Sequence, residues 1–228
     1  MSKIVRKAKN FMRRIEFIHK PYSRFVNERI HKRQCKRLHS FGYKIVAELS
    51  HLLTDNQYHM FFAYGVLLGF IRDGGFIEYD DDLDVVIVDN PSFSWDSLED
   101  LLVKNGYKKI RYFSNQGIVT EQVYEKDGLS IDFFRYFYED DHLYGVGYRR
   151  FPDVKYQFEN ERTTYKCVFP LVSGIKFIKI KGYDAAIPEN YEDLLEKWYG
   201  PTWKTPIKGF VNNQYDLYET TGEVHICG

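Results

Sequence analysis

The chain has 228 residues, 44% of them hydrophobic and 18% aromatic, with a formal net charge of zero. This length favours one domain with an extension, and the composition excludes an intrinsically disordered chain. The longest apolar run, Met60 to Ile71, is too short to cross a bilayer, and no apolar segment of a secretory signal follows the basic N-terminus. The cysteines Cys35, Cys167 and Cys227 form no C-x-x-C pair, so we expect a reducing, cytoplasmic compartment.

Basic residues concentrate at the N-terminus. Residues 1–40 hold 13 Lys and Arg against 2 Asp and Glu, and residues 41–228 hold 19 against 30. Apolar residues recur at helical spacing within the first segment, so we expect a basic amphipathic helical extension at 1–40 and the main domain at 41–228. This helix can lie on an anionic membrane surface or pack on protein, and both interpretations stay open. Nucleic-acid binding is disfavoured because no nucleic-acid-binding motif accompanies the charge.

Hydrophobic periodicity and turn residues predict a mixture of helices and strands along the chain. The expected helices lie at residues 22–53, 65–72, 94–106 and 188–201. The expected strands lie at residues 59–64, 83–88, 107–113, 118–125, 129–137 and 175–180, with a hairpin turn at 144–148. Gly42 is expected to interrupt the first helix, and Ser94 and Asn190 to act as N-caps. The predicted class is α/β or α+β, with one mixed sheet flanked by helices.

The stretch "YDDDLDVVIV" collects aspartates at the start of a hydrophobic strand. Asp82 and Asp84 are two residues apart on an extended segment, so they project from the same face. Val86 and Val88 continue this face, and the alternate residues Leu83, Val85 and Ile87 fill the other. The strand is therefore expected to be buried on both faces, with two carboxylates at one end. Such a pair favours a hard cation, Mg²⁺ or Mn²⁺.

The later segment "LSIDFF" offers a third carboxylate. Leu129, Ile131 and Phe133 alternate onto one face of the predicted strand, which leaves Asp132 on the other face. An unpaired charge within an apolar strand is costly, so Asp132 is a candidate partner of the first two aspartates. The alternative is an aspartate that faces solvent on a half-exposed strand.

The acidic stretch could also be a solvated turn or a calcium-binding loop. The solvated turn stays open as an alternative. An EF-hand loop would need glycine at its sixth position and glutamate at its twelfth, where the chain has Val85 and Pro91, so an EF-hand is excluded. The chain also lacks a Walker A sequence, an H-E-x-x-H pair and a G-x-S-x-G motif.

A glycine that opens a short helix, an Asp-x-Asp pair and a later strand aspartate together resemble the nucleotidyltransferase fold of the polymerase-β type. The longer run "AYGVLLGFIRDGGFIEYDDDLDVVIV" is similar to a narrower pattern, that of the LicD family of bacterial phosphocholine transferases and animal fukutin-related proteins. The segments "IDFF" and "YEDLLEKWYGPTWKTP" follow in the order that the family shows. The resemblance runs from about Phe62 to Pro206.

This resemblance implies roles for seven residues. Metal binding falls to Asp80, Asp82, Asp84 and Asp132, of which the last three are catalytic and Asp132 is the expected base; donor binding falls to Gly65, Val66 and Arg72. The chain departs from the family pattern at four positions. They are Val66 in place of Thr or Ser, Asp73 in place of His, Glu78 in place of Pro and Tyr79 in place of Trp.

The resemblance also implies an activity. It is the Mg²⁺- or Mn²⁺-dependent transfer of a phospho-substituent, such as phosphocholine or a polyol phosphate, from a CDP-linked donor to a hydroxyl of a cell-surface or capsular glycan. A lipid-linked acceptor at the inner membrane face would suit a peripheral contact through residues 1–40. Two alternatives stay open. They are a nucleotidyltransferase that uses a nucleoside triphosphate, and a catalytically degenerate module that binds a nucleotide or a glycan.

Overall fold

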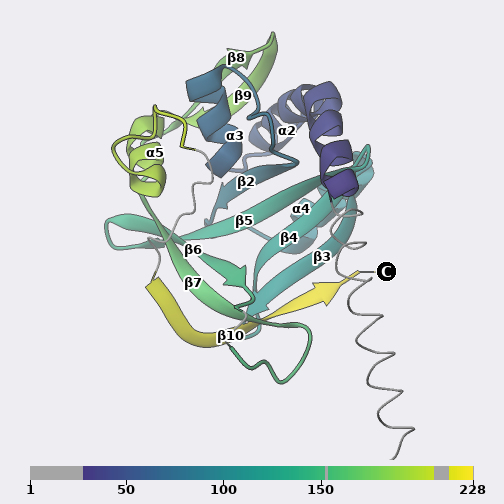
Figure 1. Cartoon of the computed structure of the whole chain (residues 1–228), viewed down its shortest axis with the longest axis vertical. Helices are drawn as coiled ribbons and strands as arrows, with labels where there is room; N and C mark the ends of the chain where they lie inside the picture. Colours follow the sequence, from purple (N-terminus) through teal and green to yellow (C-terminus); the bar gives the residue numbers. More distant parts are fainter. Residues whose placement is uncertain (1–27, 152–153, 208–215, 228) are drawn as a thin grey trace, which may run out of the picture.

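The computed structural model describes residues 28–151, 154–207 and 216–227. The helical segments are residues 28–37, η1 (Leu38–Gly42), α2 (Tyr43–Asp55), α3 (Tyr64–Leu68), η2 (Gly69–Asp73), α4 (Trp95–Lys104) and α5 (Tyr191–Tyr199). The strands are β1 (Met60–Phe62), β2 (Asp82–Val88), β3 (Lys108–Asn115), β4 (Ile118–Lys126), β5 (Leu129–Glu139), β6 (His142–Arg149), β7 (Glu161–Pro170), β8 (Ile175–Ile180), β9 (Tyr183–Pro188) and β10 (Asp216–Ile226). The predicted mixed α/β class is confirmed, with a sheet-rich core and few helices (Figure 1).

The main sheet has eight strands in the order β1-β2-β5-β4-β3-β10-β7-β6. Strands β2 and β5 pair in parallel, and the remaining pairings of this sheet are antiparallel. The C-terminal part of β5 also pairs with β6, through Phe137 and Tyr144 among others. This pairing closes β5, β4, β3, β10, β7 and β6 into a six-stranded barrel, which the sequence patterns did not predict. A separate hairpin, β8–β9, lies at the upper end of the view in Figure 1.

Strand β2 is buried on both faces, as its pattern predicts. Leu83, Val85 and Ile87 belong to a hydrophobic cluster that includes side chains of α2, α4 and β9. Val86 and Val88 belong to a second cluster, with side chains of β5, β7 and α5. The aspartates of β2 therefore share the face that looks toward α5 and the barrel strands.

The predicted hairpin turn at residues 144–148 is wrong, because these residues lie inside β6. The two glycines that suggested a turn have another role. A side chain at Gly145 would collide with the ring of Tyr136, and one at Gly147 with the ring of Tyr165. These glycines make room for aromatic rings of neighbouring strands rather than turning the chain.

The predicted helix ends have mixed outcomes. The side chain of Ser94 accepts a hydrogen bond from the Ser97 N–H at 3.4 Å, which confirms Ser94 as an N-cap. Asn190 precedes α5 but makes no capping hydrogen bond; its amide donates to the Leu171 carbonyl at 2.9 Å instead. Gly42 does not break the first helix, which passes through η1 as a π-helical turn and continues as α2.

The described end of the basic extension packs on the body of the protein. Leu38 is fully buried in the first hydrophobic cluster. Arg37 donates to the Gly128 carbonyl at 3.1 Å, and His31 Nδ1 lies 2.8 Å from Asp81 Oδ2. Residues 28–40 thus contact protein, whereas the predicted amphipathic stripe before residue 28 lies outside the described residues. Within the described part of the chain, no helix is long and apolar enough to span a membrane.

Candidate active site

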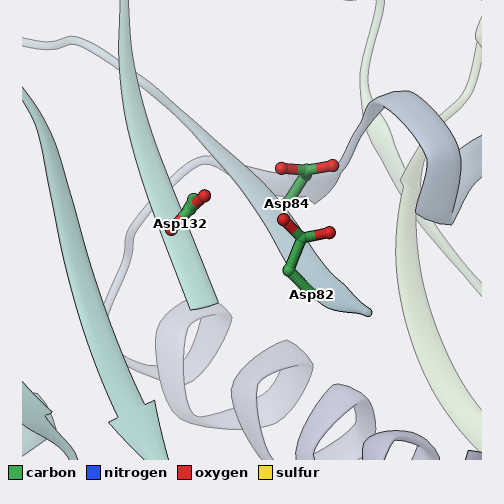
Figure 2. Close-up of side chains that lie close together, drawn as sticks. All are labelled: Asp82, Asp84 and Asp132. Carbon is green, nitrogen blue, oxygen red and sulfur yellow. The ribbon is translucent and has the colours of Figure 1, made fainter. Parts of the chain in front are cut away.

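Three aspartates from two neighbouring strands come together at the N-terminal ends of these strands. Asp82 and Asp84 lie on β2, and Asp132 lies opposite Asp84 on the parallel strand β5. One carboxylate oxygen from each of the three lies within 4.8 Å of the others (Figure 2). The parallel pairing explains why the carboxylates converge, because Asp84 and Asp132 occupy paired positions on neighbouring strands and their side chains point to the same face of the sheet. We call Asp82, Asp84 and Asp132 the acid cluster.

The acid cluster is electrostatically strained as it stands. Burial, together with the charge of Asp81, raises the pKa of Asp82 to about 6. Burial, together with the charge of Asp82, raises the pKa of Asp132 to about 7. The pKa of Asp84 is raised well above its usual range, first by burial and then by the charges of Asp82 and Asp132. Nearby positive charge would relieve all three.

The donor set of the cluster suits a hard divalent cation. It offers carboxylate oxygens alone, which is the preference of Mg²⁺ and Mn²⁺. Oδ1 of Asp132 is buried and makes no hydrogen bond among the described residues. Nη2 of Arg111 lies 3.9 Å from this oxygen, too far for a hydrogen bond. An uncompensated oxygen of this kind fits a metal ligand.

Asp80 does not belong to the group of three. It lies in the turn before β2 and lines a cavity of about 220 Å³ together with Gly65 and Arg72. Its Oδ2 is buried and has no hydrogen-bond partner among the described residues. A Cβ at Gly65 would lie 2.8 Å from this oxygen, so any other residue there would push against the carboxylate. Burial and the charges of Asp82 and Asp81 raise the pKa of Asp80 to about 6.

Arg72 faces the same cavity and is held by its sequence neighbour. Its Nε and Nη2 donate to the two carboxylate oxygens of Asp73 at 2.8 and 2.7 Å. This bidentate pair fixes the guanidinium plane and leaves the charge beside Asp80, whose pKa it lowers in part. Asp73, which departs from the family pattern, thus orients Arg72.

Val66, the third residue predicted to bind the donor, turns its side chain away from this cavity. Val66 is 1% exposed and packs in the first hydrophobic cluster. The cause is the direction of α3, which presents Gly65 to the cavity and turns the next residue into the core. The side chain of Val66 therefore does not line this cavity.

Two charged residues beside the cluster were not among the predicted site residues. Arg111 on β3 lies in the same row of the sheet as Asp132, with Val123 of β4 between them. Glu121 on β4 is 6% exposed, and the charge of Asp132 adds to burial in raising its pKa. The sequence carries no signal for Glu121, because its neighbours Thr120 and Gln122 are also polar and the segment reads as solvent-exposed, whereas the structure buries all three.

The resemblance to nucleotidyltransferases implies a mixed sheet in which an Asp-x-Asp pair lies beside a third aspartate on a parallel strand. The structure has this arrangement. The comparison with protein families agrees. Residues 57–190 match the model described as "LicD/FKTN/FKRP, nucleotidyltransferase domain". This match covers more than half of the chain, and the protein belongs to the LicD/FKTN/FKRP family.

Comparisons with individual proteins add little. No curated protein matches the chain. Among solved structures, the chain is similar to that of ANT(2″)-Ia in complex with adenylyl-2″-tobramycin, with 11% identity and a TM-score of 0.41. This similarity covers 75% of the present chain and 81% of the other.

Proposed function

We propose that this protein is a metal-dependent phosphotransferase that moves a phospho-substituent from a CDP-linked donor to a hydroxyl of a glycan. The observation that carries the proposal is the acid cluster in a chain that matches the LicD/FKTN/FKRP nucleotidyltransferase-domain model. The cluster holds three half-buried aspartates, and one of them, Asp132, has a buried oxygen that makes no hydrogen bond among the described residues. A cluster built only for stability would not keep three acids together without a cationic partner in hydrogen-bonding range.

The acid cluster would hold Mg²⁺ or Mn²⁺ through Asp82, Asp84 and Asp132. Bound ions of this kind neutralise a diphosphate and stabilise charge on a leaving nucleotide. The family resemblance implies that Asp80 is a further metal ligand. In the structure its carboxylate lies outside the acid cluster and lines the neighbouring cavity, beside Gly65.

The cavity beside Asp80 is the proposed donor site. Arg72 carries its positive charge into this space from a fixed orientation, and a fixed guanidinium suits an anionic phosphate. The absence of a side chain at Gly65 lets a donor approach the backbone of α3 closely. The aromatic residues Tyr199 and Trp203 also line the cavity and offer ring surfaces to a nucleobase.

Asp132 is the proposed general base. The pKa of Asp132 is raised to about 7 in the metal-free protein, and bound cations would lower it, so Asp132 would accept the proton of an acceptor hydroxyl on a carboxylate oxygen that no ion occupies. Arg111, whose Nη2 lies 3.9 Å from Asp132, tempers this rise. The acceptor hydroxyl would approach from the side of the barrel strands, which is the face that the three carboxylates share.

Chromatographic detection of CMP tests the proposal. The protein is incubated with CDP-choline, CDP-ethanolamine, CDP-glycerol and CDP-ribitol in Mg²⁺ or Mn²⁺, with candidate glycans as acceptors. We expect CMP from at least one donor, a loss of at least about 100-fold in Asp82→Asn and Asp132→Asn, and full activity in Asp100→Asn, an exposed aspartate on α4. Full activity in folded cluster variants would refute the proposal. Pyrophosphate release from a nucleoside triphosphate would support the nucleotidyltransferase alternative. Donor binding without turnover would support the catalytically degenerate module.

A further inference from the structure

Arg111 is a positively charged side chain at the edge of the acid cluster that the fold leaves without a close partner. It lies on β3, and its Nη2 ends 3.9 Å from Oδ1 of Asp132, too far for a hydrogen bond. Nε of Arg111 is buried and has no hydrogen-bond partner among the described residues, and the same holds for Oδ1 of Asp132. A cation and an anion thus lie close together, and each keeps a buried atom that needs a partner.

Other arginines of the protein show that this fold can close such a pair. Arg135 on β5 donates to Asp89 Oδ1 through Nε at 2.9 Å, and its Nη2 lies 2.8 Å from the same oxygen. Arg72 donates to both carboxylate oxygens of Asp73 at 2.8 and 2.7 Å. Arg111 makes no such contact with Asp132, so an ion pair that only stabilises the fold does not explain its position.

The sheet holds Arg111 on the face that carries the acid cluster. Arg111 pairs with Val123 of β4, and Val123 pairs with Asp132 of β5, so the three residues form one row. Directly paired residues place their side chains on the same face. The guanidinium carbon lies 5.8 Å from the centre of the Phe113 ring, a cation–π contact that supports this placement. The Arg111 side chain is 39% exposed, so a ligand can reach it.

A guanidinium with unused N–H donors beside a metal site is suited to an oxyanion. Its planar fork matches the spacing of phosphate oxygens. Burial raises the pKa of Asp82 and of Asp132, and the charge of Arg111 opposes this rise, so the guanidinium acts on the cluster itself. It reaches the cluster from β3, which β4 separates from β5, whereas Arg72 lines the donor cavity. The two arginines therefore approach the cluster from different elements.

We propose that Arg111 is a catalytic residue that contacts a phosphate oxygen of the transferred group. This inference rests on the proposed function. In that reaction the acceptor oxygen forms a bond to phosphorus, the bond from phosphorus to the CMP oxygen breaks, CMP keeps the electron pair, and Asp132 takes the hydroxyl proton. The negative charge of the transferred group is spread over its remaining oxygens. Arg111 would stabilise this charge, while Arg72 would bind the phosphate next to the nucleoside.

The binding of two nucleotides tests the contact without turnover. CDP carries a terminal phosphate that stands for the transferred group, and CMP lacks it. Isothermal titration calorimetry in Mn²⁺ compares both nucleotides on the full chain, on Arg111→Gln and on Lys108→Gln, which changes an exposed lysine of the same strand. We expect Arg111→Gln to lose the preference for CDP by about 10-fold or more, and Lys108→Gln to keep it. A wild-type protein without this preference, or an undiminished preference in Arg111→Gln, overturns the inference.

Two further measurements separate a contact with phosphate from a structural role. The affinity for Mn²⁺ alone should stay the same or rise in Arg111→Gln, because a positive charge near Asp132 opposes a metal ion. A fall in Mn²⁺ affinity as large as the fall in CDP affinity would mean that Arg111 only holds the cluster together, which overturns the inference. Arg111→Lys keeps the charge without the fork, so its preference for CDP should lie between those of the wild type and Arg111→Gln. It serves as the test if Arg111→Gln does not fold, and an undiminished preference in Arg111→Lys then overturns the inference.

The two proposals can fail separately. With a donor that is turned over, Arg111→Gln should lower kcat at least about 100-fold, and an unchanged kcat would overturn the catalytic role. CMP release together with an undiminished CDP preference in Arg111→Gln would keep the phosphotransferase and remove the contact. A preference for CDP that depends on Arg111, without CMP release from any donor, would keep the contact and remove the phosphotransferase.

Discussion

The acid cluster should make the stability of the metal-free protein fall as pH rises. The pKa of Asp132 is raised from 3.8, its ordinary value, to about 7, chiefly by burial and by the charge of Asp82. A rise of this size corresponds to roughly 4 kcal/mol in favour of the protonated acid in the folded state. Asp82, with a pKa of about 6, acts in the same direction. These contributions are shared between neighbours and do not simply add.

The sign follows from proton binding. An acid whose pKa is higher in the folded state stabilises the fold fully below its unfolded pKa, and this contribution disappears as pH rises through the folded pKa. The free energy of unfolding should therefore decrease between about pH 4 and pH 7 in the presence of a chelator. Asp132→Asn removes the ionisation, and it should stabilise the chelated protein at pH 8 by up to about 4 kcal/mol, which is roughly 10 °C in melting temperature.

Thermal melts at pH 5, 6, 7 and 8 measure this effect, with chelator and with added Mg²⁺ or Mn²⁺. The ions should raise the melting temperature of the wild-type protein most at pH 8, because they bind the ionised carboxylates. They should have little effect on Asp132→Asn, and Asp100→Asn should behave as the wild type. If the chelated wild-type protein and Asp132→Asn show the same pH profile, the electrostatic account of the cluster is refuted.

Three further predictions address the surroundings of the cluster. Gly65→Ala should lower the rate of CMP release at least about 10-fold with little change in melting temperature, because its methyl group would press on the Asp80 carboxylate. Adding Asp80→Ala to the Gly65→Ala protein should leave room for the methyl group. Unchanged activity in Gly65→Ala would refute the close approach between residue 65 and Asp80. Arg72→Lys should raise KM for the donor more than it changes kcat, since lysine cannot keep the bidentate contact with Asp73. An unaltered KM in steady-state kinetics would contradict a role of Arg72 in donor binding. Deletion of residues 1–20 should reduce sedimentation with anionic liposomes if the basic extension binds membranes, and equal sedimentation of both forms would exclude this contact.

The sequence allowed the acid cluster to be predicted because the relevant patterns are local. A strand buried on both faces shows an unbroken apolar run, so Asp82 and Asp84 stand out where that run begins. Asp132 stands out in the same way within β5. The period of two along each strand then assigned the aspartates to one face, and the structure places them there. Their proximity needed the family resemblance, since no local pattern states which strands pair.

The barrel could not be predicted because its closure depends on pairings between distant segments. Strand β10, Asp216–Ile226, pairs with β3, which lies about a hundred residues earlier in the chain. The glycines of β6 were misleading, because a glycine that admits a neighbouring ring has the same letter as a glycine in a turn. Glu121 was missed for a related reason. A buried glutamate on a strand has the same local pattern as an exposed one until the opposite wall of the barrel is known.

Strand β5 connects the acid cluster to a cavity of about 280 Å³, which strands β4, β5, β6 and β7 line together with Asp84, Tyr64 and Trp198. Its first half pairs with β2 and carries Asp132, and its last residues pair with β6 and complete the barrel. Phe134, which lines the cavity, lies two residues beyond Asp132 on the same face, and Asp84 borders both spaces. A ligand in the cavity and a phosphate at the cluster would therefore be held by one continuous strand. Since neighbouring strands of a closed sheet move little relative to one another, this arrangement would fix the distance between the two groups, which is the requirement for orienting a substrate for in-line attack.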